Sequence, residues 1–308
     1  MPGRDGETDL VVQLGRCRNV AFLLDVESHA GRPGWNAATI RTGTRGDNWV
    51  CVLRLVTISN SRYGDWVHVV DGPVPLRCWW ATPGFNWHDK ESISTHKRVF
   101  IVLPEVFGVN AWVRGVADRL AAAGVPALAM PLFARTAPAL ELTYETSDLA
   151  QGRRHKDATT TDQILSDLSA AITWLGRVCP GAEVSVVGFC FGGHAALLAA
   201  TLPAVKHSFD FYGAGVSRMR PGGGPPSLEL LPRIEGRLTC LCGTADPLIP
   251  AEDRAAIRAA LHENDPAGER LRYVELEGAD HGFMCDARSS YNPEAARLGW
   301  QLLERSFA

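Results

Sequence analysis

The feature that most constrains this 308-residue chain is the segment Gly-Phe-Cys-Phe-Gly-Gly at residues 188–193. An apolar run at 184–187 precedes it, and a helix-forming stretch at 194–200 follows it. This pattern predicts a strand, a sharp turn and a helix, with Cys190 at the apex of the turn. Glycines suit such a turn because they lack a Cβ and let the strand and the helix pack closely. A cysteine there lies at a helix N-terminus, which favours the thiolate and hence a nucleophile. The plainer alternative is a small buried hydrophobic residue.

Composition narrows the class of protein. Hydrophobic residues make up 46% of the chain and charged residues 21%, which is typical of a globular protein with a sizeable core. The formal net charge of −3 gives no basis for a nucleic-acid partner. No apolar run approaches the length of a membrane span, and residues 1–7 lack the apolar core of a signal peptide. We therefore expect a protein with no membrane or nucleic-acid partner. A reactive cysteine without an export signal suits the cytoplasm.

The eight cysteines are scattered and form no Cys-x-x-Cys pair. Cys240 and Cys242 are two apart on a predicted strand, so they share one face and are expected to be core residues. A metal site built from Asp280, His281 and Cys285 is conceivable, but that spacing matches no common ligand pattern. We expect neither a metal nor a cofactor.

The N-terminal part of the chain is the hardest to interpret. Residues 20–24 and 49–53 resemble strands, whereas residues 29–48 are rich in Gly, Arg, Thr and Asn and favour a loop or disorder. We treat residues 1–64 as an N-terminal extension, either ordered or poorly ordered, and residues 65–308 as one domain.

From residue 65 onward the pattern becomes regular. Two strand-like runs around Asp-Gly-Pro predict an antiparallel hairpin, and residues 99–103 form a continuous apolar run of the kind buried in a parallel sheet. Helical and strand-like segments then alternate. The hairpin strands are 67–70 and 76–80. The expected helices are 110–123, 162–175, 251–263 and one opening at 292–294, and the further strands are 125–130, 208–212, 238–242 and 271–276. This alternation predicts an α/β fold with a doubly wound, mostly parallel sheet, helices on both faces and a site at the carboxyl ends of the strands.

Two further residues complete a catalytic arrangement. Asp246 follows the predicted strand 238–242, and His281 follows the strand 271–276. The chain order Cys, Asp, His is that of the α/β-hydrolase triad. In these roles Cys190 attacks an acyl carbon, His281 transfers the proton and Asp246 orients the imidazole. Taken alone, Asp246 has a simpler explanation as a turn residue before proline, and His281 has one as part of a solvated loop.

With these residues in place, the sequence resembles the dienelactone hydrolase (carboxymethylenebutenolidase) family of α/β-hydrolases over residues 67–308. The resemblance rests on four motifs: PEVFGVN at 104–110, GFCFGG at 188–193, GTADPLIP at 243–250 and GADHGF at 278–283. FARTAP at 133–138 and FYGAG at 211–215 add weaker support. The resemblance implies an enzyme that opens enol-lactones and related esters without a metal or cofactor.

The resemblance also implies further site residues. Glu105 matches a glutamate that restrains the resting cysteine and then helps form the thiolate; alternatively, it is a turn or capping carboxylate before the helix at 110. The backbone N–H groups of Val106 and Phe191 are expected to form the oxyanion hole.

The chain departs from the family at the arginines that hold the substrate carboxylate. The position four residues after His281 is Cys285, so one arginine is missing, and Arg288 would need a different loop path to replace it. The second arginine falls within the basic run 152–156, where Arg153 and Arg154 either bind an anionic substrate or lie on a solvated surface turn.

We therefore expect a hydrolase of a lactone or activated ester, active through a Cys-His-Asp triad and a thioester acyl-enzyme, as a monomer or homodimer. A thiolate suits reactive acyl groups better than amides. The first alternative is a carboxylesterase or thioesterase for a substrate without a carboxylate. The second, of another class, is a redox or ligand-binding protein on the same scaffold.

Overall fold

The computed structural model describes residues 40–44, 47–51, 63–84 and 96–307. Contacts divide the chain into two compact units, Met1–Asn60 and Ser61–Ala308. In the first unit, β1 (Ile40–Thr44) pairs antiparallel with β2 (Asp47–Cys51). The expected loop over 29–48 is therefore wrong where β1 and the start of β2 lie, because the β-branched residues of β1 favour a strand although it lacks hydrophobic periodicity. The strand expected at 49–53 is present as far as residue 51, and the strand expected at 20–24 lies outside the described residues.

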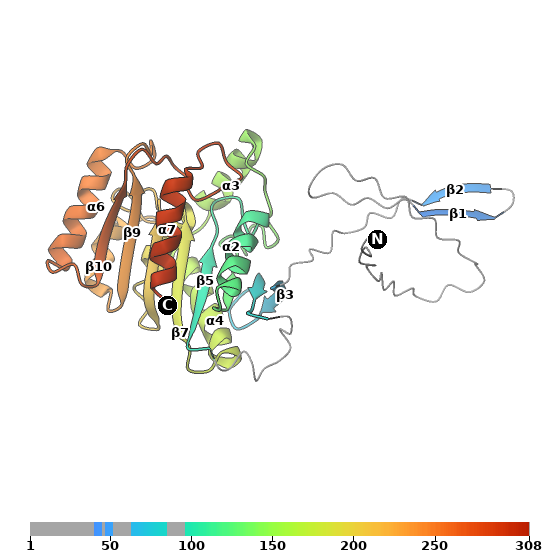
Figure 1. The fold of residues 1–308 in the computed structure, drawn as a ribbon, viewed down its shortest axis with the longest axis horizontal. Coiled ribbons are helices and arrows are strands. Elements are labelled where there is room, and N and C mark those ends of the chain that lie inside the picture. The colour runs from blue at the N-terminus through green and yellow to red at the C-terminus, as the bar shows by residue number, and fades with distance from the viewer. Residues whose placement is uncertain (1–39, 45–46, 52–62, 85–95, 308) are drawn as a thin grey trace, which may run out of the picture. The chain divides into compact units, whose positions relative to one another are not determined.

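The second unit is built on an eight-stranded sheet with the order β10-β9-β8-β7-β5-β6-β4-β3 (Figure 1). The strands from β5 to β10 run parallel to one another, whereas β4 is antiparallel to both β3 and β6. The mostly parallel sheet and the hairpin at its edge confirm the expected fold class. The strand bounds are β3 Gly64–Val69, β4 Leu76–Ala81, β5 Arg98–Leu103, β6 Ala127–Ala129, β7 Glu183–Phe189, β8 Val205–Phe211, β9 Arg237–Gly243 and β10 Leu271–Leu276.

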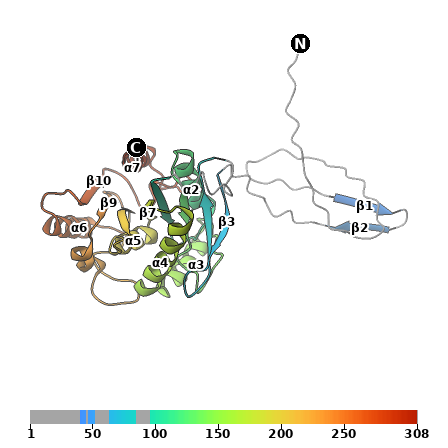
Figure 2. The same cartoon turned by 90° about the horizontal axis from the view of Figure 1, so that it is seen from below.

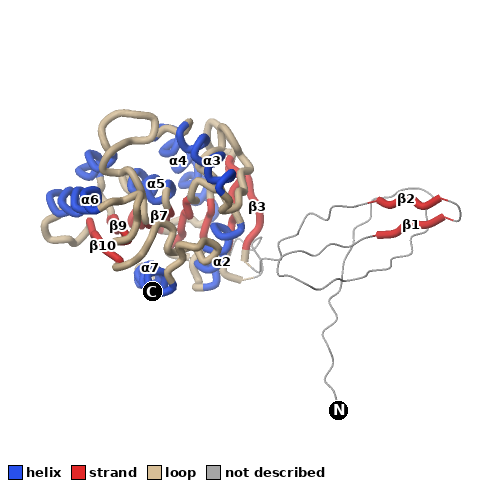
Figure 3. Tube along the Cα trace, turned by 90° about the horizontal axis from the view of Figure 1, so that it is seen from above, coloured by secondary structure: helices blue, strands red, loops and turns tan. Residues whose placement is uncertain are grey.

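Helices cover both faces of this sheet. Figures 2 and 3 show α2 (Ala111–Ala122) and α7 (Pro293–Arg305) on one face, with α4 (Thr161–Val178) and α5 (Phe191–Ala199) on the other. Buried residues of β5 alternate between the two cores because successive strand side chains point to opposite faces. Phe100 and Val102 pack with α2, and Ile101 and Leu103 pack with α4 and α5. The continuous apolar run is thus a strand buried on both sides.

Local signals fix the ends of several helices. Asn110 caps α2 by accepting from the Val113 N–H, and Asn292 caps α7 by accepting from two N–H groups. Thr160 and Gln163 form a reciprocal capping box at the start of α4. The expected helices at 110–123, 162–175 and 251–263 are confirmed, the last as α6 (Ala251–Asn264).

Two helical segments were not expected from the sequence, α3 (Thr146–Asp157) and the 3₁₀ segment η1 (Ser227–Arg233). The only buried residue of α3 is Gly152, so α3 carries no apolar stripe by which its sequence could be recognised. The interpretation of residues 152–156 as a surface turn is therefore wrong. Among the described helices, none combines the length and apolar character that crossing a membrane requires.

Candidate active site

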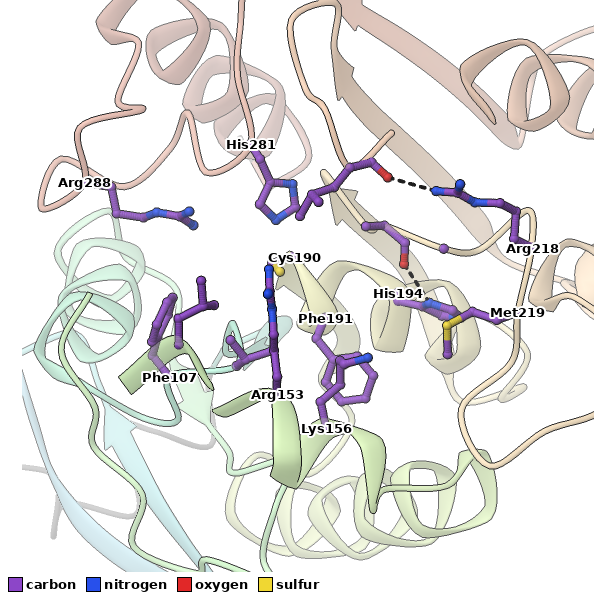
Figure 4. Close-up of a pocket in the computed structure, with 15 residues that line it drawn as sticks. Phe107, Arg153, Lys156, Cys190, Phe191, His194, Arg218, Met219, His281 and Arg288 are labelled. Atoms are coloured by element: carbon purple, nitrogen blue, oxygen red, sulfur yellow. Dashed lines mark hydrogen bonds between the residues drawn. The ribbon is translucent and has the colours of Figure 1, made fainter. Parts of the chain in front are cut away.

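The predicted functional residues gather at the carboxyl edge of the sheet. Glu105 follows β5, Cys190 follows β7, Asp246 follows β9 and His281 follows β10. Because these four strands are parallel, their carboxyl ends meet at one edge. Cys190 and His281 line one cavity there, of about 410 Å³ (Figure 4).

Cys190 occupies the sharp turn that its sequence context predicts. It has φ 54° and ψ −117°, a strained conformation for a residue with a side chain, and it is the N-cap of α5. Its own N–H donates to the Phe211 carbonyl at 3.0 Å, which ties the turn to β8. The thiol is half-buried and faces the cavity at the positive end of the helix. In this position the cysteine is accessible from the cavity.

Glycines allow the strand and the helix to approach on either side of the cysteine. A Cβ on Gly188 would lie 1.8 Å from the Gly192 carbonyl oxygen, and a Cβ on Gly192 would lie 2.4 Å from the Leu103 carbonyl oxygen. Neither position tolerates a side chain without movement of the backbone. The start of α5 is therefore pressed against the end of β5, beside Val106.

Asp246 and His281 form a buried pair. The Nδ1 atom of His281 lies 2.8 Å from Oδ2 of Asp246, while the Leu248 N–H donates to Oδ1 of the same carboxylate at 2.8 Å. A carboxylate can only accept, so Nδ1 carries the hydrogen and Nε2 is left for the cavity. Within the described part of the chain, Nε2 of His281 is buried and has no hydrogen-bond partner. Such contacts are often long before substrate binds.

The charge state of His281 is set by its surroundings. Burial lowers the pKa of His281, but the Cys190 sulfur and the Asp246 carboxylate outweigh burial and raise it to about 10. The imidazole therefore favours its protonated form at neutral pH.

Tyr212 is a supporting residue that sequence reasoning did not single out. It is fully buried with φ 44°, and its ring packs edge-on against His281 at 5.2 Å and against Phe283 at 4.9 Å. Its ring therefore helps to position the imidazole by packing against it. The available signal was the FYGAG motif at 211–215, which contains it.

Glu105 is buried and bonded to Arg288. Arg288 Nη1 donates to Glu105 Oε1 at 2.7 Å, and the other carboxylate oxygen has no partner in the described part of the chain. Burial raises the pKa of Glu105, while the charges of Arg288 and His281 oppose that rise. Glu105 thus lies within the electrostatic reach of His281, and it does not cap α2, because Asn110 does.

Arg288 reaches the site through a compact series of turns after His281. The backbone N–H groups of Cys285, Arg288 and Tyr291 donate to carbonyls three residues earlier, which folds the segment back on itself. The guanidinium then lies across Gly282, where a Cβ would meet Arg288 Nη1 at 2.4 Å. This path places Arg288 in the cavity wall, whereas Cys285 is buried.

The helix α3 contributes another wall of the cavity. Arg153 and Lys156 line the cavity, whereas Arg154 does not, although both arginines are exposed. Gly152 lets α3 pack against the main chain at Val106, because a Cβ there would lie 2.3 Å from the Val106 carbonyl oxygen. Of the two predicted arginines in this run, Arg153 alone is placed to meet a bound molecule.

Val106 and Phe191, the predicted oxyanion residues, both line the cavity beside Cys190. Phe191 is the first residue of α5, so its N–H has no acceptor within the helix. The oxyanion hole remains a prediction that this arrangement allows.

The sheet order, the layered helices and the strand–turn–helix around Cys190 define an α/β-hydrolase. Solved structures agree on the fold. A crystal structure named as a dienelactone hydrolase, from Klebsiella pneumoniae, covers 79% of this chain and 97% of its own, with a TM-score of 0.66 and 24% identity. The dienelactone hydrolase-like promiscuous phosphotriesterase P91, from metagenomic libraries, gives a TM-score of 0.62 at 22% identity, covering 79% of this chain and 96% of its own.

Sequence comparison identifies the family. Residues 88–308 match the model of the dienelactone hydrolase family. A Synechocystis sp. protein that bears the name carboxymethylenebutenolidase is 42% identical over 212 residues, which are 68% of this chain and 85% of the relative. A Bradyrhizobium sp. protein named as a probable 2-oxo-3-(5-oxofuran-2-ylidene)propanoate lactonase is 30% identical over 206 residues, 65% of this chain and 79% of the relative. The chain belongs to the dienelactone hydrolase family and is a hydrolase of ester or lactone bonds.

Proposed function

We propose that the chain hydrolyses a lactone or an activated ester through Cys190, His281 and Asp246, with a thioester acyl-enzyme as intermediate. The observation that carries the proposal is the buried hydrogen bond of 2.8 Å between His281 Nδ1 and Asp246 Oδ2, in a cavity that also holds Cys190. This hydrogen bond orients Nε2 of His281 for proton transfer in the cavity that Cys190 lines.

The first half of the reaction forms the acyl-enzyme. The Cys190 thiolate attacks the carbonyl carbon, a carbon–sulfur bond forms, and the carbonyl electrons move to oxygen. The N–H groups of Val106 and Phe191 stabilise that oxygen. The tetrahedral intermediate then expels the ester oxygen, which takes the proton from Nε2 of His281. In a lactone this oxygen stays attached to the acyl group.

The second half releases the product. Water attacks the thioester carbonyl carbon, and Nε2 of His281 takes a proton from that water. The carbon–sulfur bond breaks, its electron pair returns to sulfur, and the carboxylic acid leaves. Asp246 stabilises the imidazolium in both halves. Glu105 tunes the charge balance of the site through His281 and Arg288.

We further propose that the substrate carries an anionic group, as the resemblance to the dienelactone-cleaving members implies. Arg153 and Arg288 both line the cavity that holds Cys190 (Figure 4). A substrate carboxylate bound by Arg288 would compete with Glu105 for the guanidinium. Because position 285 is a cysteine, this recognition rests on Arg288 together with Arg153.

The ion pair between Arg288 and Glu105 favours the second candidate, a carboxylesterase or thioesterase for a substrate without a carboxylate. Arg288 is already bonded to Glu105, so its charge is partly satisfied before a substrate arrives. A panel of paired lactones and aryl esters, with and without a free carboxylate, separates the two. A higher kcat/KM for the anionic members supports the first proposal, and equal values support the second.

The nucleophile is tested with Cys190→Ala and Cys190→Ser on p-nitrophenyl acetate. Both changes are expected to lower kcat by at least about 10³-fold, because the acyl-enzyme step is lost or starts from a poorly activated hydroxyl. Mass spectrometry of a quenched reaction should detect the acyl adduct on wild-type Cys190 only. Wild-type turnover in Cys190→Ala would refute the mechanism and favour a redox or ligand-binding role.

A further inference from the structure

Two exposed apolar side chains, called here the apolar rim, line the cavity. They are Met219 and Leu248, with exposed fractions of 40% and 39%. They are two of the four large hydrophobic side chains exposed in the described part of the chain. Isolated exposed hydrophobic residues are common, but two that share the mouth of an active-site cavity form a surface that a ligand can cover.

The segment that carries Met219 is held in place from beneath. His194 Nδ1 donates to the Ala214 carbonyl at 3.0 Å, and Ser227 Oγ donates to His194 Nε2 at 2.7 Å. Burial lowers the pKa of His194 to about 4, so its ring is neutral and this tautomer is fixed. The Met219 N–H in turn donates to the Gly215 carbonyl at 2.9 Å. The segment that carries Met219 is therefore held in place by hydrogen bonds before a ligand binds.

The Leu248 side of the rim is fastened to the catalytic loop. The Leu248 N–H bonds to Asp246, and the Leu248 carbonyl accepts from Arg218 Nη2 at 3.3 Å. Arg218 also forms an ion pair of 2.7 Å with the buried Asp253. Arg218, the neighbour of Met219 in the sequence, thus links the Met219 segment to the Leu248 segment.

The cations near the apolar rim have acidic partners of their own. Arg218 pairs with Asp253, and Lys156 pairs with Asp157 at 2.7 Å. In contrast, no ion pair joins Arg153, on the wall nearer Cys190, to an acid among the described residues. The end of the cavity at Met219 and Leu248 therefore presents mainly an apolar surface to a ligand.

We propose that Met219 and Leu248 form a subsite for an apolar substituent of the substrate, a short alkyl chain or an aromatic ring. This inference rests on the proposed function and specifies its substrate class. In Figure 4, Arg288 and Met219 lie at opposite ends of the cavity, with Cys190 and His281 between them. The substrate accordingly bears its apolar group on the opposite side of the reacting carbonyl from the group that faces Arg288.

Equilibrium binding tests the subsite without requiring hydrolysis. The probes are two series, 4-alkylbenzoates and the neutral 4-alkylbenzamides, with methyl to butyl chains, measured by titration calorimetry. Each added methylene that enters the subsite is expected to lower Kd about threefold in the wild-type protein. The benzamide series keeps the result independent of the arginines, and Cys190 plays no part in the readout.

The variants Leu248→Ser and Met219→Ser should flatten the dependence of Kd on chain length while leaving the methyl member within about twofold. The matched control is Val70→Ser, which replaces a side chain that is 70% exposed and is not in the cavity lining. That control should keep the wild-type dependence. A Kd independent of chain length in the wild type, or an unchanged dependence in both rim variants, would overturn the proposal. Failure of the Cys190 experiment alone would leave it standing.

Discussion

Arg288 and Glu105 are 183 residues apart in the sequence, yet Nη1 of one lies 2.7 Å from Oε1 of the other at the wall of the active-site cavity. The carboxylate is 1% exposed and the guanidinium side chain 21%. The pair joins the segment after the central strand β5 to the loop that follows His281. Its removal should therefore affect both stability and chemistry.

The first prediction concerns Arg288→Met. A buried carboxylate without its partner is destabilising, so the free energy of unfolding should fall by about 3 kcal/mol near neutral pH. Losing Arg288 removes one of the charges that hold down the pKa of Glu105, which burial already raises. Urea unfolding monitored by tryptophan fluorescence measures the change.

The pH dependence of that loss has a definite sign. A folded-state pKa of Glu105 above its unfolded value means that the folded state binds the proton more tightly, so the deficit should shrink as the pH falls below neutrality. The double variant Arg288→Met/Glu105→Gln, which carries no buried charge, should recover much of the lost stability. A deficit that is independent of pH and unrelieved by Glu105→Gln would contradict this account.

The second prediction concerns Asp246→Asn and the pH profile. The Cys190 sulfur and the Asp246 carboxylate overcome burial and raise the pKa of His281 to about 10, so the protonated imidazole persists into alkaline solution. In Asp246→Asn the alkaline limb of kcat/KM should move to lower pH, and kcat should fall by about 10³- to 10⁴-fold. Stopped-flow ester hydrolysis over a range of pH provides the measurement.

The control for that experiment is Asp286→Asn, an exposed carboxylate in the loop after His281. It changes the net charge by the same amount but should leave the alkaline limb in place. An identical shift in both variants would point to a general charge effect and away from the hydrogen bond.

The third prediction compares two glycines. Gly188→Ala would place a Cβ 1.8 Å from the Gly192 carbonyl oxygen, so we expect a loss of about 3 kcal/mol or more and the loss of activity. Gly176→Ala, within α4, meets no atom within 4 Å and should stabilise the protein by up to about 1 kcal/mol through helix propensity. Thermal unfolding by circular dichroism distinguishes these opposite signs. Equal effects of the two substitutions on stability would show that close packing at the turn does not restrict the residue at position 188.

The fourth prediction compares neighbouring arginines on α3. Arg153→Met should raise KM for a carboxylate-bearing lactone about tenfold, because a charge-assisted contact is lost from the cavity wall. Arg154→Met, which removes the same charge from an exposed position outside the lining, should leave KM within about twofold. Steady-state kinetics with the matched neutral lactone completes the comparison. A tenfold effect from Arg154→Met would reverse the assignment.

The sequence was informative where function depends on local pattern. The strand–turn–helix around Cys190 follows from glycines and apolar runs that lie within about a dozen residues. The loops that carry Asp246 and His281 follow from the alternation of strands and helices, because parallel strands bring their carboxyl ends together. Strand periodicity likewise predicted that Cys240 and Cys242 would be core residues, and both are buried.

The sequence was less informative where function depends on distant contacts. The α3 helix has no apolar stripe, since the face that meets the protein does so through Gly152. The approach of Arg288 to Glu105 depends on a series of turns that no periodicity reveals. Tyr212 owes its position to a left-handed backbone conformation, which a bulky side chain rarely adopts and which pattern reasoning does not anticipate.

The absence of a side chain at Gly152 has a mechanical consequence for this enzyme. The helix bearing Arg153 rests directly on the main chain at Val106, without a cushion of side-chain atoms to absorb displacement. Under the proposed mechanism, Arg153 binds the substrate and the Val106 amide stabilises the oxyanion, so both roles depend on this one contact. We therefore expect substitutions that tilt α3 to change substrate selectivity and turnover together.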